Sequence, residues 1–556
     1  MLRAEALQLE FSKIGLKSAT QNYTLNTSTD SRRGTNTYAV FYAPRSDGTE
    51  ALVLSAPWTS RTSETNTNAI AMLLTLGKVF KRSSHFSKDV IFVVSDGNVE
   101  GLQAWLKAYH GNEENTEIVE FNLEAKNMFT LLPLDRFEET LHIRSGAIQA
   151  ALNLDFPGTG DYNALGIFFE GVNGQLPNLD MINTIRKISE SIAPVTLTLH
   201  DELVPNTENM TKNYINSLKK MLYMMKYQVA GTPTGNHGLY LKYKIDAITL
   251  HAIDRPDWPS HRFNLLRLGS LVESAVRSLN NLLEHLHQSF FFYLLSGVRN
   301  YTSIGLYMPP VIILGVSFIF QALSLWGLSS DLPLELEAIN EGKKVAIALP
   351  YSRRSRSFKA PATIIGMSFV AGWASFHLLT TSFGFPGETP LLKLVASAGV
   401  CGMLIPSAVS TVRIRSHILK KSGKAETSDA SLAPAADWII LKTFILALSA
   451  LIVTTLSALN FSLAVTIGVI IVFPYMAFRP SSYIIISGIQ AIALMAISPP
   501  GLLMAGAWLY SKDISLVLNW VLEGYEVLGS WLLPMLCCIY WPLNLAAIVM
   551  VLMPVS

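Results

Sequence analysis

Several segments in the first half of the chain place carboxylate or imidazole side chains directly after an apolar run. Asp96 and Glu100 follow one run, Asp155 closes another, and His237 lies in a later Gly-Asn-His-Gly segment. Carboxylates and imidazoles bind metal ions and transfer protons, and active sites of α/β proteins form at strand ends. The chain has no Gly-x-Ser-x-Gly elbow, P-loop or dinucleotide-binding fingerprint. These strand ends are therefore the principal candidate site.

The elements that must position these side chains alternate along residues 1–262. The predicted strands are 37–43, 51–56, 90–95, 148–154, 165–169 and 244–250. The predicted helices are 67–82, 99–110, 178–192 and 211–228. Buried apolar strands that alternate with helices indicate a layered α/β domain with a largely parallel sheet.

This order of strand ends resembles the zinc aminopeptidase-like fold, which glutaminyl cyclases also use. In that family the first strand ends in His-x-Asp, an Asp precedes the next helix, and a Glu-Glu pair precedes Gly-Leu. An Asp and a His follow later, and together these groups hold one or two zinc ions and supply a general base. The positions that differ here are Pro57-Trp58, Asn66 or Asn68, and Asn98-Val99.

Only Asp155 and His237 match the zinc-binding pattern of that family. A catalytic zinc site normally has three protein ligands and a water molecule, so two matches cannot complete one. We therefore expect Asp155 and His237 to be vestigial and hydrogen-bonded within the fold. The resemblance then implies a degenerate domain with no catalytic residue, no metal and no cofactor.

The segment 263–300 connects this domain to the second half of the chain. Apolar residues recur at helical spacing over 263–288, which predicts an amphipathic helix. Two placements are open for it. The helix can pack on the domain's own sheet, or it can lie on a bilayer surface.

The remaining residues, 301–556, have the composition of a polytopic membrane domain. Only 15% of the whole chain is charged, against about 25% in a typical soluble domain. A spanning helix needs about 20 mostly apolar residues. The candidate stretches are 306–328, 361–383, 391–411, 438–458, 461–478, 483–508 and 530–553. We therefore expect an all-α transmembrane bundle of about seven helices.

The loops between these stretches predict the orientation. Lys and Arg gather after the first, third and fifth stretches, and the loops between carry almost none. Because such residues accumulate in the cytosol, the first domain should face the lumen or exterior, and the C-terminus the cytosol. Three Asn-x-Ser/Thr sequons in that domain agree, and Asn22, Asn26 and Asn209 are glycosylation candidates. A translocated domain needs a signal peptide or a leading span. The first residues resemble neither, so we expect that an N-terminal anchor is missing from this chain.

Four residues within the apolar stretches are candidates for lipid contact. Pro499 and Pro500 interrupt the sixth stretch and free backbone polar groups there. His377 and Gln490 are polar residues at membrane depth, where such residues are functional candidates. Each has a plainer alternative, a structural kink for the prolines and interhelical hydrogen bonds for the other two.

Longer motifs give a sharper resemblance. They are EGVNGQLPNLD at 170–180, LHQSFFFYLLSG at 286–297, SIGLYMP at 303–309, GNHGLY at 235–240 and AWLKAYH at 104–110. These resemble the glycosylphosphatidylinositol (GPI) anchor attachment proteins, the Gaa-type subunits of the GPI transamidase complex. Members of that family have a luminal aminopeptidase-like domain without a full metal set, followed by a multi-span half.

The resemblance implies a non-catalytic subunit in the endoplasmic reticulum membrane that helps bind the GPI lipid and assemble the complex. The complex attaches GPI anchors to precursor proteins, and its catalytic chemistry belongs to a separate caspase-like subunit. The implied partners are that subunit, other subunits, the lipid and the membrane, and no nucleic acid. Two alternatives stay open. One is a metal-dependent aminopeptidase-like enzyme that forms or cleaves an amide bond itself, and the other is a transporter.

Overall fold

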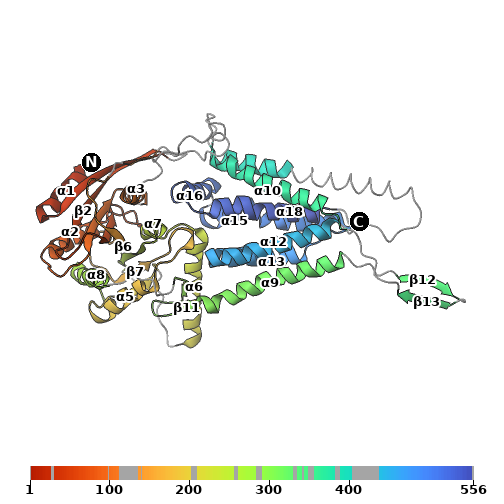
Figure 1. Ribbon diagram of the computed structural model, residues 1–556, viewed down its shortest axis with the longest axis horizontal. Helices are drawn as coiled ribbons and strands as arrows, with labels where there is room; N and C mark the ends of the chain where they lie inside the picture. Colours follow the sequence, from red (N-terminus) through yellow and green to blue (C-terminus); the bar gives the residue numbers. More distant parts are fainter. Residues whose placement is uncertain are drawn as a thin grey trace. The chain divides into compact units, whose positions relative to one another are not determined.

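The computed structural model describes residues 2–26, 31–97, 99–111, 136–138, 141–201, 209–255, 261–282, 291–329, 335–340, 343–348, 356–381, 389–403, 437–511 and 513–553. The chain divides into two compact units. The first unit is Met1–Tyr307 with Glu526–Ser530, and the second is Met308–Tyr525 with Trp531–Ser556. In Figure 1 the first unit carries the strand-rich red to yellow part of the chain, and the second carries most of the green to blue helices.

The first unit alternates strands and helices as the sequence predicts. Its strands are β1 (Lys17–Asn26), β2 (Ser31–Phe41), β3 (Glu50–Pro57), β4 (Asp89–Ser95), β5 (Arg136–Glu138), β6 (Ala147–Asp155), β7 (Ala164–Phe168), β8 (Leu197–Leu199), β9 (Asp246–Ile253), β10 (Tyr293–Leu295) and β11 (Tyr301–Ser303). Its α-helices are α1 (Leu2–Ile14), α2 (Thr67–Lys81), α3 (Val99–His110), α5 (Leu179–Ser191), α6 (Met210–Ala230), α7 (His237–Lys242) and α8 (Leu265–Asn280).

Nine of these strands form one sheet, in the order β5-β1-β2-β4-β3-β6-β9-β7-β8. The four central strands β4, β3, β6 and β9 are parallel, which confirms the predicted α/β class at the centre of the domain. Antiparallel pairs flank this centre, because β2 runs against β4 and β7 runs against β9. All seven residues of β4 are buried, as expected for a strand that helices cover on both faces.

Helices cover the sheet in two layers. On one face, α3 packs against β1, β2 and β4, and α7 packs against β6 and α3. On the other face, α1 and α2 pack on β2, and α8 packs on β3, α2 and α5. The amphipathic segment predicted over 263–288 is thus the helix α8, and its apolar face lies inside the first unit, with Leu268 and Leu271 fully buried. Residues 283–290 lie outside the described residues.

The short segment Glu526–Ser530 belongs to the first unit although it follows the helix α16 (Ile514–Glu526) of the second. The amide nitrogen of Gln103 donates a hydrogen bond of 2.6 Å to the carbonyl of Val527. Leu528 packs against the apolar cluster of α3 and α7 that contains Trp105 and Leu239. One late loop of the chain is therefore part of the α/β domain.

Where the structure describes it, the second unit is helical apart from a β-hairpin. Its main elements are α9 (Ile304–Leu328), β12 (Glu335–Asn340), β13 (Lys343–Ala348), α10 (Lys359–Thr380), Pro390–Met403, α12 (Asp437–Leu459), α13 (Phe461–Ala477), α14 (Ile484–Ala496), α15 (Pro499–Gly506), α16, α17 (Leu532–Met535) and α18 (Trp541–Val551). The first four residues of α9 belong to the first unit.

The expected bundle of about seven spanning helices is not confirmed in number. Among the described residues, four helices are long and apolar enough to cross a membrane: Ile304–Leu328, Lys359–Thr380, Asp437–Leu459 and Leu532–Leu552. A fifth span is possible if α14 and its continuation Pro499–Leu509, which are bent by 62° at the Pro499-Pro500 break, count as one. The stretches predicted at 391–411 and 461–478 appear as shorter apolar helices, Pro390–Met403 and Phe461–Ala477. The first of these adjoins residues 404–436, which lie outside the described part of the chain.

Candidate functional site

The carboxyl ends of the parallel strands β3, β4, β6 and β9 hold most of the polar side chains that the sequence singles out. Asp155 ends β6 and lies directly opposite His251 of β9 in the register of the sheet. The Nδ1 atom of His251 lies 3.0 Å from Oδ2 of Asp155, and both side chains are almost fully buried. Asp155 is thus hydrogen-bonded within the fold, and its partner is a histidine other than the predicted His237.

Arg61 extends this pair into a cluster of charges. Its backbone N–H donates to Oδ2 of Asp155 at 3.3 Å, and its guanidinium lies 3.7 Å from the carboxylate of Asp201. The guanidinium also stacks over the ring of Phe168, 3.6 Å from the ring centre. Asp201 in turn lies 3.8 Å from Nε2 of His251. Arg61 therefore contacts both carboxylates, Asp155 through its backbone N–H and Asp201 through its guanidinium.

The two asparagines at the start of α2 connect neighbouring strand ends. The amide nitrogen of Asn66 donates to the carbonyls of Pro57 and Leu154 at 2.9 and 3.0 Å, and its oxygen accepts from the backbone N–H of Phe156 at 2.7 Å. Asn68 donates to the hydroxyl of Tyr162 at 2.8 Å. The buried amide of Asn66 thus holds the ends of β3 and β6 together. A carboxylate at this position could not, because it has no N–H to donate to the two carbonyls.

The acidic residues that follow β4 are also paired. Arg3 of α1 forms an ion pair with Asp96, and Thr35 donates its backbone N–H to the same carboxylate at 3.1 Å. Arg32 of β2 forms an ion pair with Glu100. These contacts direct both carboxylates toward α1 and β2. Asn98 lies outside the described residues.

His237 begins α7 and belongs to a second buried network. Its Nε2 donates to the carbonyl of Glu170 at 3.0 Å, and its Nδ1 accepts from the hydroxyl of Thr249 at 2.8 Å. Complete burial lowers the pKa of His237 to about 4, so the ring is neutral at physiological pH. This tautomer, set by its two bonds, leaves neither nitrogen available as a metal ligand.

Glu170 itself is a buried carboxylate paired with His200. Nε2 of His200 lies 2.7 and 2.9 Å from the two carboxylate oxygens, and the hydroxyl of Thr234 donates to one of them at 3.0 Å. Burial alone would raise the pKa of Glu170, but the charge interaction and hydrogen bond with His200, a backbone hydrogen bond and the nearby His237 together lower it. The network ties the end of β7 to β8 and to the segment before α7.

These positions do not form a metal centre. In the described part of the chain, no group of three or more His, Cys, Asp or Glu side chains is arranged to hold a metal ion. The two residues that match the zinc pattern, Asp155 and His237, have separate partners. A zinc ion therefore does not fit the described residues at these strand ends.

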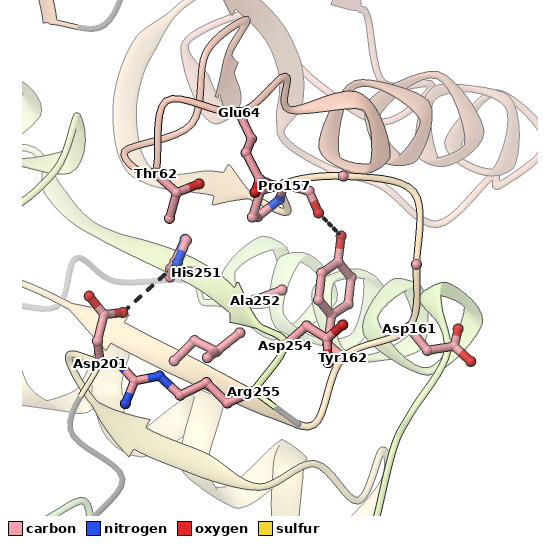
Figure 2. Close-up of a pocket in the computed structure, with 13 residues that line it drawn as sticks. Thr62, Glu64, Pro157, Asp161, Tyr162, Asp201, His251, Ala252, Asp254 and Arg255 are labelled. Carbon is pink, nitrogen blue, oxygen red and sulfur yellow. Dashed lines mark hydrogen bonds and ion pairs between the residues drawn. The ribbon is translucent and has the colours of Figure 1, made fainter. Parts of the chain in front are cut away.

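A pocket of about 380 Å³ opens beside the Asp155–His251 pair. Figure 2 shows His251 and Asp201 facing each other on one side, and Tyr162 on the other side, where its hydroxyl donates to the carbonyl of Pro157 at 2.7 Å. Glu64, Asp161 and Asp254 also line the pocket, and so does Arg255, so carboxylates outnumber cations among its charged side chains.

The four lipid-contact candidates lie in the second unit. At the break between α14 and α15, Ser498 caps the new helix and Pro499 is its first residue. Two carbonyls near this break accept hydrogen bonds from α18 and from the π-helix Leu536–Tyr540 before it: Asn544 donates to Leu494 at 2.8 Å, and Tyr540 donates to Ile497. The bend is thus stabilised by internal bonds, as a structural kink would be.

His377 and Gln490 differ in their surroundings. The ring of His377 packs edge-on against Trp373 of the same helix, with ring centres 4.3 Å apart. Oε1 of Gln490 is buried and has no hydrogen-bond partner among the described residues. The amide oxygen of Gln490 can therefore accept a further hydrogen bond.

Comparison with known proteins identifies the family. Residues 33–548 match a family model described as Gaa1-like, GPI transamidase component. The chain belongs to this family. The GPI transamidase component gaa1 of Schizosaccharomyces pombe is 34% identical over 349 residues, which are 62% of this chain and 54% of that protein. The GPI transamidase component GAA1 of Saccharomyces cerevisiae is 32% identical over 295 residues, 52% of this chain and 42% of that protein. The matches thus span about half the length of these relatives.

Solved structures resemble this family member only loosely. A glutaminyl cyclase of Fimbriiglobus ruber covers 50% of this chain and 86% of its own, with 14% identity and a TM-score of 0.30. The LapA aminopeptidase of Legionella pneumophila covers 50% of this chain and 65% of its own, with 10% identity and a TM-score of 0.30. Values this low carry no argument about chemistry.

Sequence reasoning missed Arg61, His251, Asp201 and the Glu170–His200 pair. His251 directly follows the predicted strand 244–250, so a strand one residue longer would have placed it at the rim beside Asp155. His200 and Asp201 follow β8, which has only three residues and no recognisable pattern. Arg61 lies in a loop, and nothing in the sequence marks it.

Proposed function

We propose that this chain is a non-catalytic subunit of the GPI transamidase complex in the endoplasmic reticulum membrane. The family match over residues 33–548 carries the proposal. The carboxyl edge of the sheet supports the non-catalytic role, because Asp96, Glu100 and Asp155 there each lie beside an arginine or a histidine. In this reading a separate caspase-like subunit performs the cleavage and transfer, and the present chain helps to bind the GPI lipid and to assemble the complex.

The test is replacement of Asp155 by Asn in cells that depend on this chain, with a GPI-anchored reporter measured at the cell surface. The signal is normalised to the amount of assembled complex. A non-catalytic Asp155 predicts a normalised signal within about twofold of the unsubstituted chain. Loss of a catalytic acid–base group typically costs about 10²–10⁴-fold, and a loss of that size would refute the non-catalytic role. Asp161→Asn, an exposed carboxylate on the pocket wall, is the matched control.

Partner binding is tested by affinity purification of the tagged full chain from membranes. The proposal predicts that a caspase-like protein with a Cys-His pair co-purifies in constant proportion. Co-purification of other membrane proteins without such a subunit would contradict the assignment to the transamidase, whatever the activity of the rim variants.

For the lipid, we propose contact near the Pro499-Pro500 break, with Gln490 as the polar group and His377 as a second candidate. Oε1 of Gln490 supports this, since it finds no donor in the described part of the chain and a buried amide oxygen without a donor costs free energy. Gln490→Leu should lower the reporter signal at constant complex assembly. Ile492→Leu, on the exposed side of the same helix, should leave it unchanged.

The orientation is part of the same proposal. The first unit would face the lumen, with the C-terminus in the cytosol. Asn209 is exposed, and only its Oδ1 is used to cap α6. Its amide nitrogen, the atom that would carry a glycan, is not used in the cap. Asn22 lies within β1, where its Oδ1 accepts from Thr35 at 2.9 Å, and the side chain of Asn26 is outside the described residues. Glycosidase treatment of the Asn209→Gln, Asn22→Gln and Asn26→Gln variants tests all three sites.

A further inference from the structure

The helix α6 is long, well capped and mostly uncovered. It has 21 residues, begins at the cap residue Asn209 and ends at Gly231, which has the left-handed conformation typical of a helix end. Only Met224 and Gln228 are buried. A surface helix of a globular domain normally buries a whole stripe of apolar residues, so α6 has a second face that the first unit leaves open.

That open face is apolar. Tyr214, Leu218 and Leu222 are spaced by four residues and lie one above another on the helix. Ile215 lies beside them, and the four side chains are 70%, 38%, 52% and 45% exposed in the order Tyr214, Leu218, Leu222, Ile215. A contiguous exposed apolar stripe of this kind marks a contact surface.

Lysines follow one edge of this stripe. Lys212, Lys219 and Lys226 recur every seven residues, so they form a row along the helix. The helix contains no Asp or Glu. A long lysine side chain can lay its methylene groups along an apolar surface and keep its ammonium group in water. An apolar stripe edged by lysines is the pattern of a helix that lies in a membrane interface.

The position of α6 in the first unit also indicates contact with the membrane interface. The helix packs against β10, and the backbone N–H of Leu295 lies 3.1 Å from the sulfur of Met224. The hairpin of β10 and β11 ends at Ser303, and the apolar helix α9 starts at the next residue. Figure 1 shows α6 beside β11. A helix of 25 residues is about 37 Å long, which exceeds a hydrocarbon core of about 30 Å. The hairpin therefore meets the headgroup region, and α6 is attached to that hairpin.

We propose that α6 docks on the surface of the protein's own bilayer, with the Tyr214–Leu218–Leu222 stripe in the interface and the lysine row on anionic phospholipid headgroups. The sequence left two placements open for 263–288, the domain's own sheet or a bilayer surface, and α8 in that segment has its apolar face inside the domain. The proposal does not depend on the function proposed above. An acidic protein surface is the other occupant that the charges would allow, and the test separates the two.

The test uses the full chain in lipid nanodiscs that contain a phospholipid with a photoactivatable group near the headgroup end of its acyl chain. After irradiation, mass spectrometry locates the cross-linked peptides. We expect cross-links on residues 210–226 and on the ends of the spanning helices. The internal control is Leu266 of α8, which is 78% exposed and not part of the proposed surface. Labelling of α6 should exceed labelling at Leu266 at least fivefold.

Two further comparisons test the mechanism. The double variant Lys212→Gln/Lys219→Gln should lower α6 labelling in nanodiscs that contain phosphatidylserine. The expected decrease is about fivefold for each lysine removed, because each lysine near an anionic surface contributes about 1 kcal/mol. Lys187→Gln, an exposed lysine of α5, should not change it. Absence of α6 labelling while the spanning helices are labelled would overturn the proposal. So would equal labelling of α6 and Leu266, or an α6 that in native membranes cross-links to a protein and not to lipid.

Discussion

The buried pair of Glu170 and His200 allows a quantitative test of what holds the candidate site together. Both side chains are at most 3% exposed, and two contacts of 2.7 and 2.9 Å join the imidazole to the carboxylate. Removing one partner of such a pair typically costs about 3–5 kcal/mol, because the other polar group is left buried without compensation. Glu170→Ala would also leave the hydroxyl of Thr234 without this acceptor.

We therefore expect Glu170→Ala to destabilise the first unit by about 3–5 kcal/mol. For a domain of this size such a loss lowers the midpoint of thermal unfolding by on the order of 10 °C. Glu170→Gln keeps an oxygen that can accept from His200 and should cost about 1–3 kcal/mol. The assay is thermal unfolding of the full chain in detergent at pH 7, followed by tryptophan fluorescence.

The matched control is Glu190→Ala. Glu190 also pairs with two cations, Arg186 and Arg299, but its side chain is 39% exposed. Exposed pairs contribute about 0–1 kcal/mol, so this variant should unfold within about 3 °C of the unsubstituted chain. If Glu170→Ala and Glu190→Ala shift unfolding equally, the argument that burial makes the Glu170–His200 pair important is refuted.

Three further predictions concern burial, spanning helices and close packing. Because the folded pKa of His237 is about 4 and the reference value is 6.5, the unfolded state binds more protons between these values and stability falls as the pH drops. The loss from pH 7 to pH 5 is about 2 kcal/mol, and His237→Gln should remove it from the pH dependence of unfolding. Asn544→Ala removes the bond to the Leu494 carbonyl beside the helix break and should cost about 0.6–1.7 kcal/mol, measured as earlier thermal aggregation in detergent. Gly166→Ala places a methyl group 2.5 Å from the His200 carbonyl oxygen and should cost about 1–3 kcal/mol, measured by the same melts.

The sequence alone predicts the helices and strands whose local pattern of residues is strong. The run 90–95 predicts β4 (Asp89–Ser95) within one residue, because five consecutive large apolar residues fit a strand buried on both faces. The helices α2 and α3 begin at the predicted residues. In contrast, α1 and β1 were missed. The strand β1 is rich in Thr, Ser, Asn and Gln, and its ten-residue pairing with β2 stabilises it through the ladder and not through an apolar run.

The candidate site was less predictable because its contacts depend on strand order. Asp155 and His251 are 96 residues apart, and they meet only because β6 and β9 are neighbours in register. No local pattern in either strand specifies that neighbour. His237 was noticed for its residue type, but complete burial and the bond to the Glu170 carbonyl give it a structural role. Residue type and approximate position are thus readable from sequence, and partners are not.

The arrangement of arginines explains how this domain can keep carboxylates at the carboxyl edge of its sheet, where the described residues form no metal site. A buried carboxylate without a nearby cation is costly, and in a zinc site the metal supplies the positive charge. Here Asp96 lies beside Arg3 and Glu100 beside Arg32, while Asp155 and Asp201 lie around Arg61 and His251. The three arginines come from α1, β2 and the loop after β3, so three different elements supply positive charge to this edge of the sheet. An arginine that belongs to the chain supplies positive charge beside these carboxylates without a bound ion, which lowers the cost of keeping them partly buried.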